Sequence, residues 1–285
     1  MASQAYTTSF YHTEPFTAGE KLQLSMFISD QTWVYAIFGA SFKKVVELCE
    51  VNMNEDTIRS YSQAERVDYL IHNHGLHQKS FEKVLVAVLN NRFTLVPDAF
   101  AGEGTTKALL EFASGGAAIK TSASHHLNGM EFGFSVADDL SAVLERHFPN
   151  VSIRHAGAVS VQLLQVNHSL REANLFMSLH GEQLELLARN AGGLLFYNVF
   201  TVNSEEDVLY YLLFMMEQYQ LNPLLSKLVI ACEKAVNDDL FKSIRKYIKS
   251  VNFAVGDPRL QVSGAIATLP QHYYFTLLNQ SLCEL

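Results

Sequence analysis

Histidines gather in one short segment, where their imidazoles could bind a metal ion. His72, His74 and His77 lie close together in the chain, and His125 and His126 form a second pair. Imidazole nitrogens are common zinc ligands. The segment has the pattern of a helix end, however, where successive side chains point in different directions and the helix dipole alone favours histidine. We therefore predict no metal site.

The segment from residue 101 to residue 107 (Ala-Gly-Glu-Gly-Thr-Thr-Lys) is the nearest approach to a phosphate-binding loop. Such a loop needs four residues between its glycines and a lysine directly after the second glycine. Here one residue separates Gly102 from Gly104, and Lys107 comes three positions later. The segment favours a loop at the start of a helix. Because no Ser-His-Asp order or carboxylate pair stands out either, we predict no catalytic residues.

Composition restricts the class of protein. Of the 285 residues, 48% are hydrophobic and 18% charged, with a formal net charge of −8 and a pI of about 5.7. Such a chain has the apolar content of a globular protein. Its 21 Lys and Arg residues are spread along the whole length rather than clustered, which disfavours nucleic-acid binding. No signal peptide is visible, and the longest apolar run, 208–216, is too short for a membrane span. We expect a cytoplasmic protein without membrane insertion.

The cysteines give no covalent framework. Cys49, Cys232 and Cys283 are far apart, odd in number and flanked by apolar residues, and no Cys-x-x-Cys occurs. This spacing supports neither a zinc site nor a set of disulfides. Reduced, buried thiols in a cytoplasmic protein are the expected state.

The same order of elements occurs twice along the chain. In each half, three β-rich runs are followed by a capping box that starts a helix, and then by a buried-looking strand. In the first half these are 22–30, 31–38 and 44–51, then Ser62 with Glu65, then 83–88. In the second half they are 173–179, 183–189 and 194–202, then Ser204 with Asp207, then 227–232.

The two helices also align without a gap. Besides the capping boxes, Tyr69 falls on Tyr211 and Leu70 on Leu212. We predict an α/β protein made by tandem duplication of a β-β-β-α-β unit, with an N-terminal lobe over 1–150 and a C-terminal lobe over 151–285. The boundary falls near Pro149 and Asn150, and the last helix could pack back on the first lobe.

The remaining segments complete each half. We expect a strand at 93–97, a helix at 98–112, a surface loop at 114–129, a strand at 131–136 and a helix at 138–147. A strand follows at 151–154 and a helix at 158–166, and the C-terminal part carries a helix at 238–248, a strand at 251–255 and a helix at 271–283. The helix that starts at Ser204 is apolar around much of its circumference, which is typical of a core helix or of a surface that binds a partner.

A tandem β-β-β-α-β-α-β duplication resembles the actin-like ATPase fold of sugar kinases, the Hsp70 nucleotide domain and actin, which belongs to the ribonuclease H-like folds. The resemblance narrows to an uncharacterised bacterial family with this fold. It rests on the order of 94–97, then 148–150 with His155, then 204–220, and finally 272–278 with Cys283. These are core residues rather than a catalytic motif, and they extend over nearly the whole chain.

The resemblance also implies where a nucleotide would bind in active members of the fold. The first hairpin turn should pair a strand-ending Asp with Gly, and here Asp30 is followed by Gln31 and Thr32. The second turn should offer Asp and glycine-rich backbone, and here it reads His180-Gly181-Glu182. The adenosine site should carry a Gly-Gly pair, where this chain has Ala231, Cys232 and Glu233. The cofactor-binding candidates are therefore Asp30, Gln31, Thr32, His180, Gly181, Glu182, Ala231 and Glu233.

Two functions follow from these departures. The first is a non-catalytic binding or scaffold protein, a pseudo-enzyme on a degenerate actin-like fold, which acts on an unknown protein partner. The alternative is a divergent nucleotide-binding protein or ATPase/phosphotransferase that binds ATP and magnesium in the cleft between the lobes. The alternative depends on whether the backbones of the two hairpin turns can approach a triphosphate.

Overall fold

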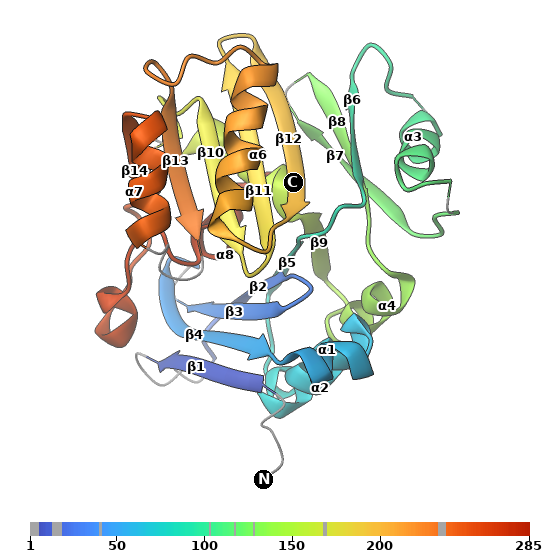
Figure 1. Ribbon diagram of the computed structural model, residues 1–285. Helices are drawn as coiled ribbons and strands as arrows, with labels where there is room; N and C mark the ends of the chain where they lie inside the picture. The colour runs from blue at the N-terminus through green and yellow to red at the C-terminus, as the bar shows by residue number, and fades with distance from the viewer. Residues whose placement is uncertain are drawn as a thin grey trace. The chain divides into compact units, whose positions relative to one another are not determined.

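The computed structural model describes residues 6–12, 19–39, 42–102, 104–116, 118–127, 129–167, 170–232 and 238–285. The chain divides into two compact units. The first unit comprises Met1–Val159, Arg259–Thr268 and Glu284–Leu285, and the second comprises Ser160–Pro258 and Leu269–Cys283. Each unit contains its own large mixed β-sheet (Figure 1).

The main sheet of the first unit has the strand order β1-β4-β3-β2-β5-β9. Strands β2, β3 and β4 are the predicted antiparallel meander, and β5 and β9 join it in parallel. Strands β2 and β3 are buried along their whole lengths, as central strands covered on both faces are. Since β9 pairs with β5, the sheet runs past residue 150. The strands are β1 (Tyr6–His12), β2 (Gln23–Ile28), β3 (Thr32–Gly39), β4 (Lys44–Met53), β5 (Lys83–Val88) and β9 (Val151–His155).

The helices of the first unit include the predicted capped helix. Ser62 Oγ accepts a hydrogen bond from the Glu65 amide at 3.2 Å, and Glu65 Oε2 accepts one from the Ser62 amide at 2.7 Å. This capping box starts α2 (Gln63–Asn73), which packs against α4 (Asp138–His147). The chain adds α1 (Glu55–Ser60), which the sequence did not predict, and a 3₁₀ turn at Leu76–Gln78.

A small antiparallel sheet, β6-β8-β7, carries α3 against it (Figure 1). Two predictions are wrong here. The expected helix at 98–112 begins only at residue 105, because residues 97–101 form a turn and Gly104 takes a left-handed φ of 80°. The expected loop at 114–129 contains β7, a polar and largely exposed strand that pairs with β8. The elements are β6 (Phe93–Pro97), α3 (Thr105–Ala113), β7 (Ser122–Leu127) and β8 (Met130–Ser135).

The sheet of the second unit has the strand order β12-β11-β10-β13-β14. The first three strands are the predicted antiparallel meander, and β13 and β14 join in parallel. One face of this sheet packs on α6 (Glu205–Gln218) and α7 (Asp238–Tyr247) through a continuous apolar cluster (Figure 1). The strands are β10 (Leu175–His180), β11 (Gln183–Asn190), β12 (Gly193–Thr201), β13 (Lys227–Cys232) and β14 (Ser250–Phe253).

The C-terminal helix is shorter than predicted. Instead of one helix at 271–283, the chain forms α8 (Phe275–Asn279) and a 3₁₀ turn at Gln280–Leu282. The preceding residues form a turn, in which the Tyr273 amide donates to the Pro270 carbonyl at 3.0 Å. This turn bridges to the end of β13, where the Cys232 amide donates to the His272 carbonyl at 3.1 Å. The Tyr274 amide donates back to the Cys232 carbonyl at 3.1 Å. The remaining helical segments are α5 (Ala156–Val166) and the 3₁₀ turn Gly264–Thr268.

The two large sheets share one plan. In both sheets the first three strands form an antiparallel meander, and the next two join in parallel beside the first strand of that meander. The corresponding strand orders are β4-β3-β2-β5-β9 and β12-β11-β10-β13-β14. Both capping boxes are present, and Leu70 and Leu212 are both buried in their helices. This arrangement is what a tandem duplication predicts, although the duplication itself stays a prediction.

Candidate functional site

The first hairpin turn, between β2 and β3, is closed by its own polar groups. The Ser29 amide donates to the Thr32 carbonyl at 2.9 Å, and the Thr32 amide donates to Ser29 Oγ at 3.0 Å. Asp30 is exposed at the tip, Gln31 is half-buried, and the β-branched side chain of Thr32 is buried. Two of the amides in this turn are therefore already committed within it.

Side chains from α2 hold the same turn from outside. Gln63 Nε2 donates to the Ser29 carbonyl at 3.0 Å, and Arg66 Nη1 donates to the Asp30 carbonyl at 3.2 Å. Arg66 is only 7% exposed, and this burial lowers the pKa of its guanidinium, although the charge of Asp30 acts in the opposite direction. The carbonyl of Gln31 accepts from the Met53 amide at 3.3 Å. The turn is thus tied both to α2 and to the end of β4.

The second hairpin turn has a structural reason for its glycine. His180 pairs with Gln183, so that Gly181 and Glu182 form a two-residue turn between β10 and β11. Gly181 has a φ of 60°, and glycine at this first position is what the type II′ hairpin turn requires. Gly181 and Glu182 are exposed, and the Glu182 carbonyl accepts from the Val202 amide at 2.8 Å.

A buried polar group of residues, the Glu185 cluster, lies just behind this turn. It consists of Ser178 and His180 on β10, Glu185 on β11, Tyr197 on β12 and Ser160 on α5. Ser178 Oγ lies 2.7 Å from His180 Nε2, and Ser178 and Glu185 are directly paired across the two strands.

Burial controls the chemistry of the Glu185 cluster. Desolvation raises the pKa of the Glu185 carboxyl, although His180, Ser160 and Tyr197 all favour its charged form. Burial also raises the pKa of the Tyr197 hydroxyl. Serine, histidine and a carboxyl are the groups of a hydrolytic triad. Ser178, His180 and Glu185 are each at most 2% exposed, however, so a substrate has no access to the serine. The cluster is a buried group of polar side chains in the second unit.

The third predicted position lies at the end of β13. Ala231 is buried and pairs with Ser178 of β10, so that it lies at the same end of the sheet as the second turn. The backbone of Cys232 pairs with residues 272–274, where active members of the fold would offer glycines to adenosine. Glu233 lies outside the described residues. Asp30, Gln31 and Thr32 belong to the first unit, and the other described candidates belong to the second.

Comparison with known proteins places the chain in a family. A family model described as a protein of unknown function (DUF3822) matches residues 14–251. The chain belongs to the DUF3822 family. No curated protein matches it.

Solved structures show the fold of this DUF3822 chain. A Bacteroides thetaiotaomicron VPI-5482 protein, described as having an actin-like ATPase fold and unknown function, is 18% identical. The similarity covers 85% of this chain and 94% of that one, with a TM-score of 0.71. A structure of the PilM–PilN type IV pilus biogenesis complex is 9% identical, covers 90% of this chain and 95% of that one, and has a TM-score of 0.51. The predicted resemblance and the actin-like ATPase fold are confirmed.

Helix α6 of this DUF3822 chain has a buried apolar face and an exposed pair of aromatic rings. Val208, Leu212, Met215 and Met216 are buried in the apolar cluster below it. On another face of the helix Tyr210 and Phe214 are 60% and 46% exposed and stack on each other, with ring centroids 5.8 Å apart. Among the described residues no helix, α6 included, is long and apolar enough to cross a membrane.

Proposed function

We propose that this protein is a non-catalytic binding or scaffold protein on a degenerate actin-like ATPase fold, and that it acts by binding a protein partner. The observation that carries the proposal is the closed first hairpin turn. Phosphate is held by several free backbone N–H groups that converge on it. Here the Thr32 amide is bonded to Ser29 Oγ, and the carbonyls of Ser29 and Asp30 are fixed to α2.

The other two positions support the same function. Gly181 is explained by the positive φ that the hairpin turn requires, so it does not indicate a phosphate site. The end of β10 also lacks the Asp that would hold magnesium. At the end of β13, Ala231 and Cys232 occupy the place of the glycine pair. Each departure removes a different contact of a nucleotide, so that restoring one of them would not restore binding.

The alternative is a divergent nucleotide-binding protein, ATPase or phosphotransferase that uses ATP with magnesium. One observation favours it: Asp30 is exposed in the turn that follows β2, and the cationic side chain of Arg66 lies directly beside this turn. An anion that displaced the Ser29–Thr32 bond would meet that guanidinium. The two functions differ in whether nucleotide binds at all.

We expect Mg·ATP, Mg·ADP and Mg·GTP to leave the thermal stability of the full chain unchanged at millimolar concentration, because the turn offers them too few free amides. A ligand at a hundred times its dissociation constant would add about 2.7 kcal/mol of stability. Thermal-shift titration, repeated by isothermal calorimetry, measures this. A stabilisation that is lost in Asp30→Ala and kept in Asp98→Ala would overturn the proposal, since Asp98 is a comparable carboxylate after β6.

The exposed pair on α6 supports a partner-binding role. Aromatic side chains are enriched in interfaces, and two stacked rings on one helix face expose more apolar area than isolated surface residues do. We expect the double variant Tyr210→Ser/Phe214→Ser to lower the recovery of a cross-linked protein partner by at least about tenfold. Its stability should change little, because both residues lie on the exposed face of α6, outside the apolar cluster.

The matched control for this experiment is Tyr247→Ser, which removes an exposed aromatic ring near the end of α7. Cross-linking in native cells followed by quantitative mass spectrometry compares the three chains. A partner kept by the wild type and by Tyr247→Ser, and lost with the double variant, is the expected result. Identical sets of cross-linked proteins for all three chains would count against partner binding through α6.

A further inference from the structure

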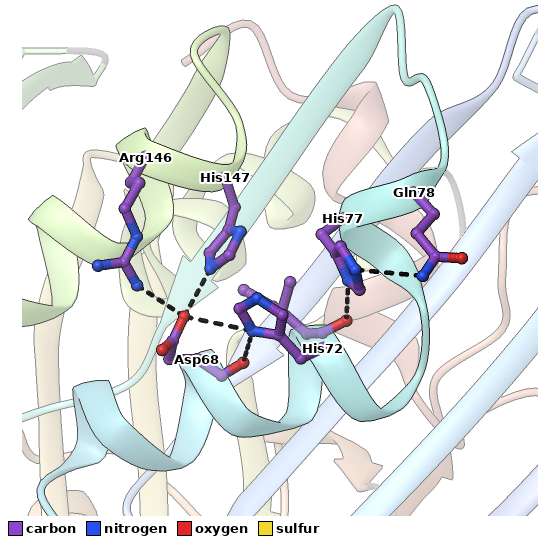
Figure 2. A network of polar contacts seen from close by, with 7 residues as sticks. Asp68, His72, His77, Gln78, Arg146 and His147 are labelled. Carbon is purple, nitrogen blue, oxygen red and sulfur yellow. Dashed lines mark hydrogen bonds and ion pairs between the residues drawn. The ribbon is translucent and has the colours of Figure 1, made fainter.

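Three side chains that can ligate a metal ion converge where α2 packs against α4 in the first unit. Asp68 and His72 lie one helical turn apart on α2, and His147 is the last residue of α4 (Figure 2). One ligand atom from each of the three lies within 4.8 Å of the other two. Of the histidines at 72–77, His72 therefore lies beside His147 from a distant part of the chain. His74 instead packs on Trp33 and Tyr35.

The carboxylate of Asp68 is the centre of this group, here called the Asp68 site. Its Oδ1 atom lies 2.6 Å from His147 Nε2 and 3.6 Å from His72 Nδ1. The same oxygen accepts a hydrogen bond from Arg146 Nη2 at 2.7 Å. Figure 2 shows all three side chains directed at the one carboxylate. Arg146 thus supplies a positive charge at the position that a cation would take.

The backbone already orients one of the imidazoles. His72 Nδ1 lies 2.9 Å from the carbonyl oxygen of Asp68, which can only accept, so Nδ1 carries the proton. The neutral ring then keeps its lone pair on Nε2, which is therefore the ligand atom that His72 offers, whereas the 3.6 Å separation from Asp68 Oδ1 is that of its protonated nitrogen. Metal-binding histidines commonly donate their second ring N–H to a carbonyl in this way, and the bond fixes both the tautomer and the direction of the ring.

We propose that the Asp68 site binds a divalent transition-metal ion, with Zn²⁺ as the first candidate, through Asp68, His72 and His147. Two imidazoles and a carboxylate are the donors that zinc accepts, whereas Mg²⁺ and Ca²⁺ prefer sites made of oxygen atoms. His72 is 52% exposed on its side chain, so the site is open to solvent, which can complete the coordination.

The ion competes with Arg146 for the carboxylate. The Arg146 side chain is 61% exposed, so its guanidinium can turn from Asp68 into solvent. A bound ion joins residues of α2 to the end of α4, so that it cross-links two helices that are far apart in the sequence. Because an ion that binds only the folded chain stabilises it, Zn²⁺ should raise the unfolding temperature of the chain.

Titration of the full, untagged and chelator-treated chain with zinc chloride tests the site. We expect one Zn²⁺ per chain by calorimetry, with Mg²⁺ and Ca²⁺ giving no heat, and a raised unfolding temperature that a chelator reverses. His72→Gln and His147→Gln should each weaken the affinity by at least about tenfold. Arg146→Gln should tighten binding, because it removes the competing cation. His72 is exposed, so its variant should fold normally even if His147→Gln does not.

A second histidine–aspartate pair provides the matched control. His126 Nε2 lies 3.1 Å from Asp98 Oδ1 on the surface of the same unit, and no third metal-ligating side chain joins them among the described residues. His126→Gln should leave the zinc affinity unchanged. The proposal fails if Zn²⁺ does not bind, if His72→Gln binds it as tightly as the wild type, or if His126→Gln weakens it equally.

Discussion

Trp33→Ala is expected to lower the free energy of unfolding by about 3–5 kcal/mol, the range for an aromatic side chain removed from a core. Trp33 lies on β3, in the centre of the first sheet, and is fully buried. Its ring centroid is 5.1 Å from that of Tyr35 and 5.5 Å from that of His74. Strand β3 cannot move into the space that the indole leaves, because hydrogen bonds to β2 and β4 hold it on both sides.

Urea unfolding followed by far-UV circular dichroism measures this loss, because the variant lacks the single tryptophan that fluorescence would need. Trp33→Phe is the control. The indole N–H is buried without a hydrogen-bond partner in the part of the chain that the structure describes, and phenylalanine removes this unpaired donor. We expect the phenylalanine variant to lose less than half as much stability. Equal losses for the two variants would show that ring volume does not set the stability of this sheet.

The sequence predicts most of the fold because its local signals agree with one another. Alternating or continuous apolar residues set the strands, and Ser62 with Glu65 and Ser204 with Asp207 mark the helix starts at the positions where the structure has them. Strand β7 escapes prediction because it is polar and exposed, so that only its pairing with β8 makes it a strand. Pairing of this kind joins residues that no local pattern connects.

The candidate sites depend on such distant contacts even more strongly. The sequence placed Asp30 at the end of a strand, but nothing in it indicates that Gln63 and Arg66 would bind the turn from α2. His147 carries no signal of its own until α4 packs beside His72. Glu185 had one signal: it is an acidic residue at the centre of the apolar run Leu184-Glu-Leu-Leu187, where burial on a strand was to be expected.

Glu185→Gln is expected to make the chain more stable at neutral pH and to flatten part of its pH dependence. Burial raises the pKa of the Glu185 carboxyl above its ordinary value of 4.5. The folded chain therefore holds this proton more tightly than the unfolded chain does. The stability that the protonated Glu185 carboxyl contributes is fully present below pH 4.5. This contribution is lost as the pH rises through the folded pKa, because the unfolded chain releases the proton first. Glutamine is neutral at every pH and avoids this loss.

The measurement is the free energy of unfolding of wild type and variant from pH 4 to pH 8. The difference between the two should grow with pH above 4.5 in favour of Glu185→Gln. Glu182→Gln is the matched control, since Glu182 is exposed in the adjacent turn and should change no slope. Glu185→Ala should instead cost about 2–5 kcal/mol, because it leaves a cavity among Ser160, Tyr197 and His180.

The two substitutions together distinguish a buried neutral carboxyl from a buried ion. If Glu185 were charged and paired with a protonated His180, removal of its charge would leave the imidazolium unpaired, and Glu185→Gln would be strongly destabilised at neutral pH. If the carboxyl is neutral, as its burial favours, glutamine replaces it at little cost and only alanine is destabilising. A Glu185→Gln variant that is less stable than the wild type at pH 7 would therefore assign the ion pair, and with it a charged group behind the second hairpin turn.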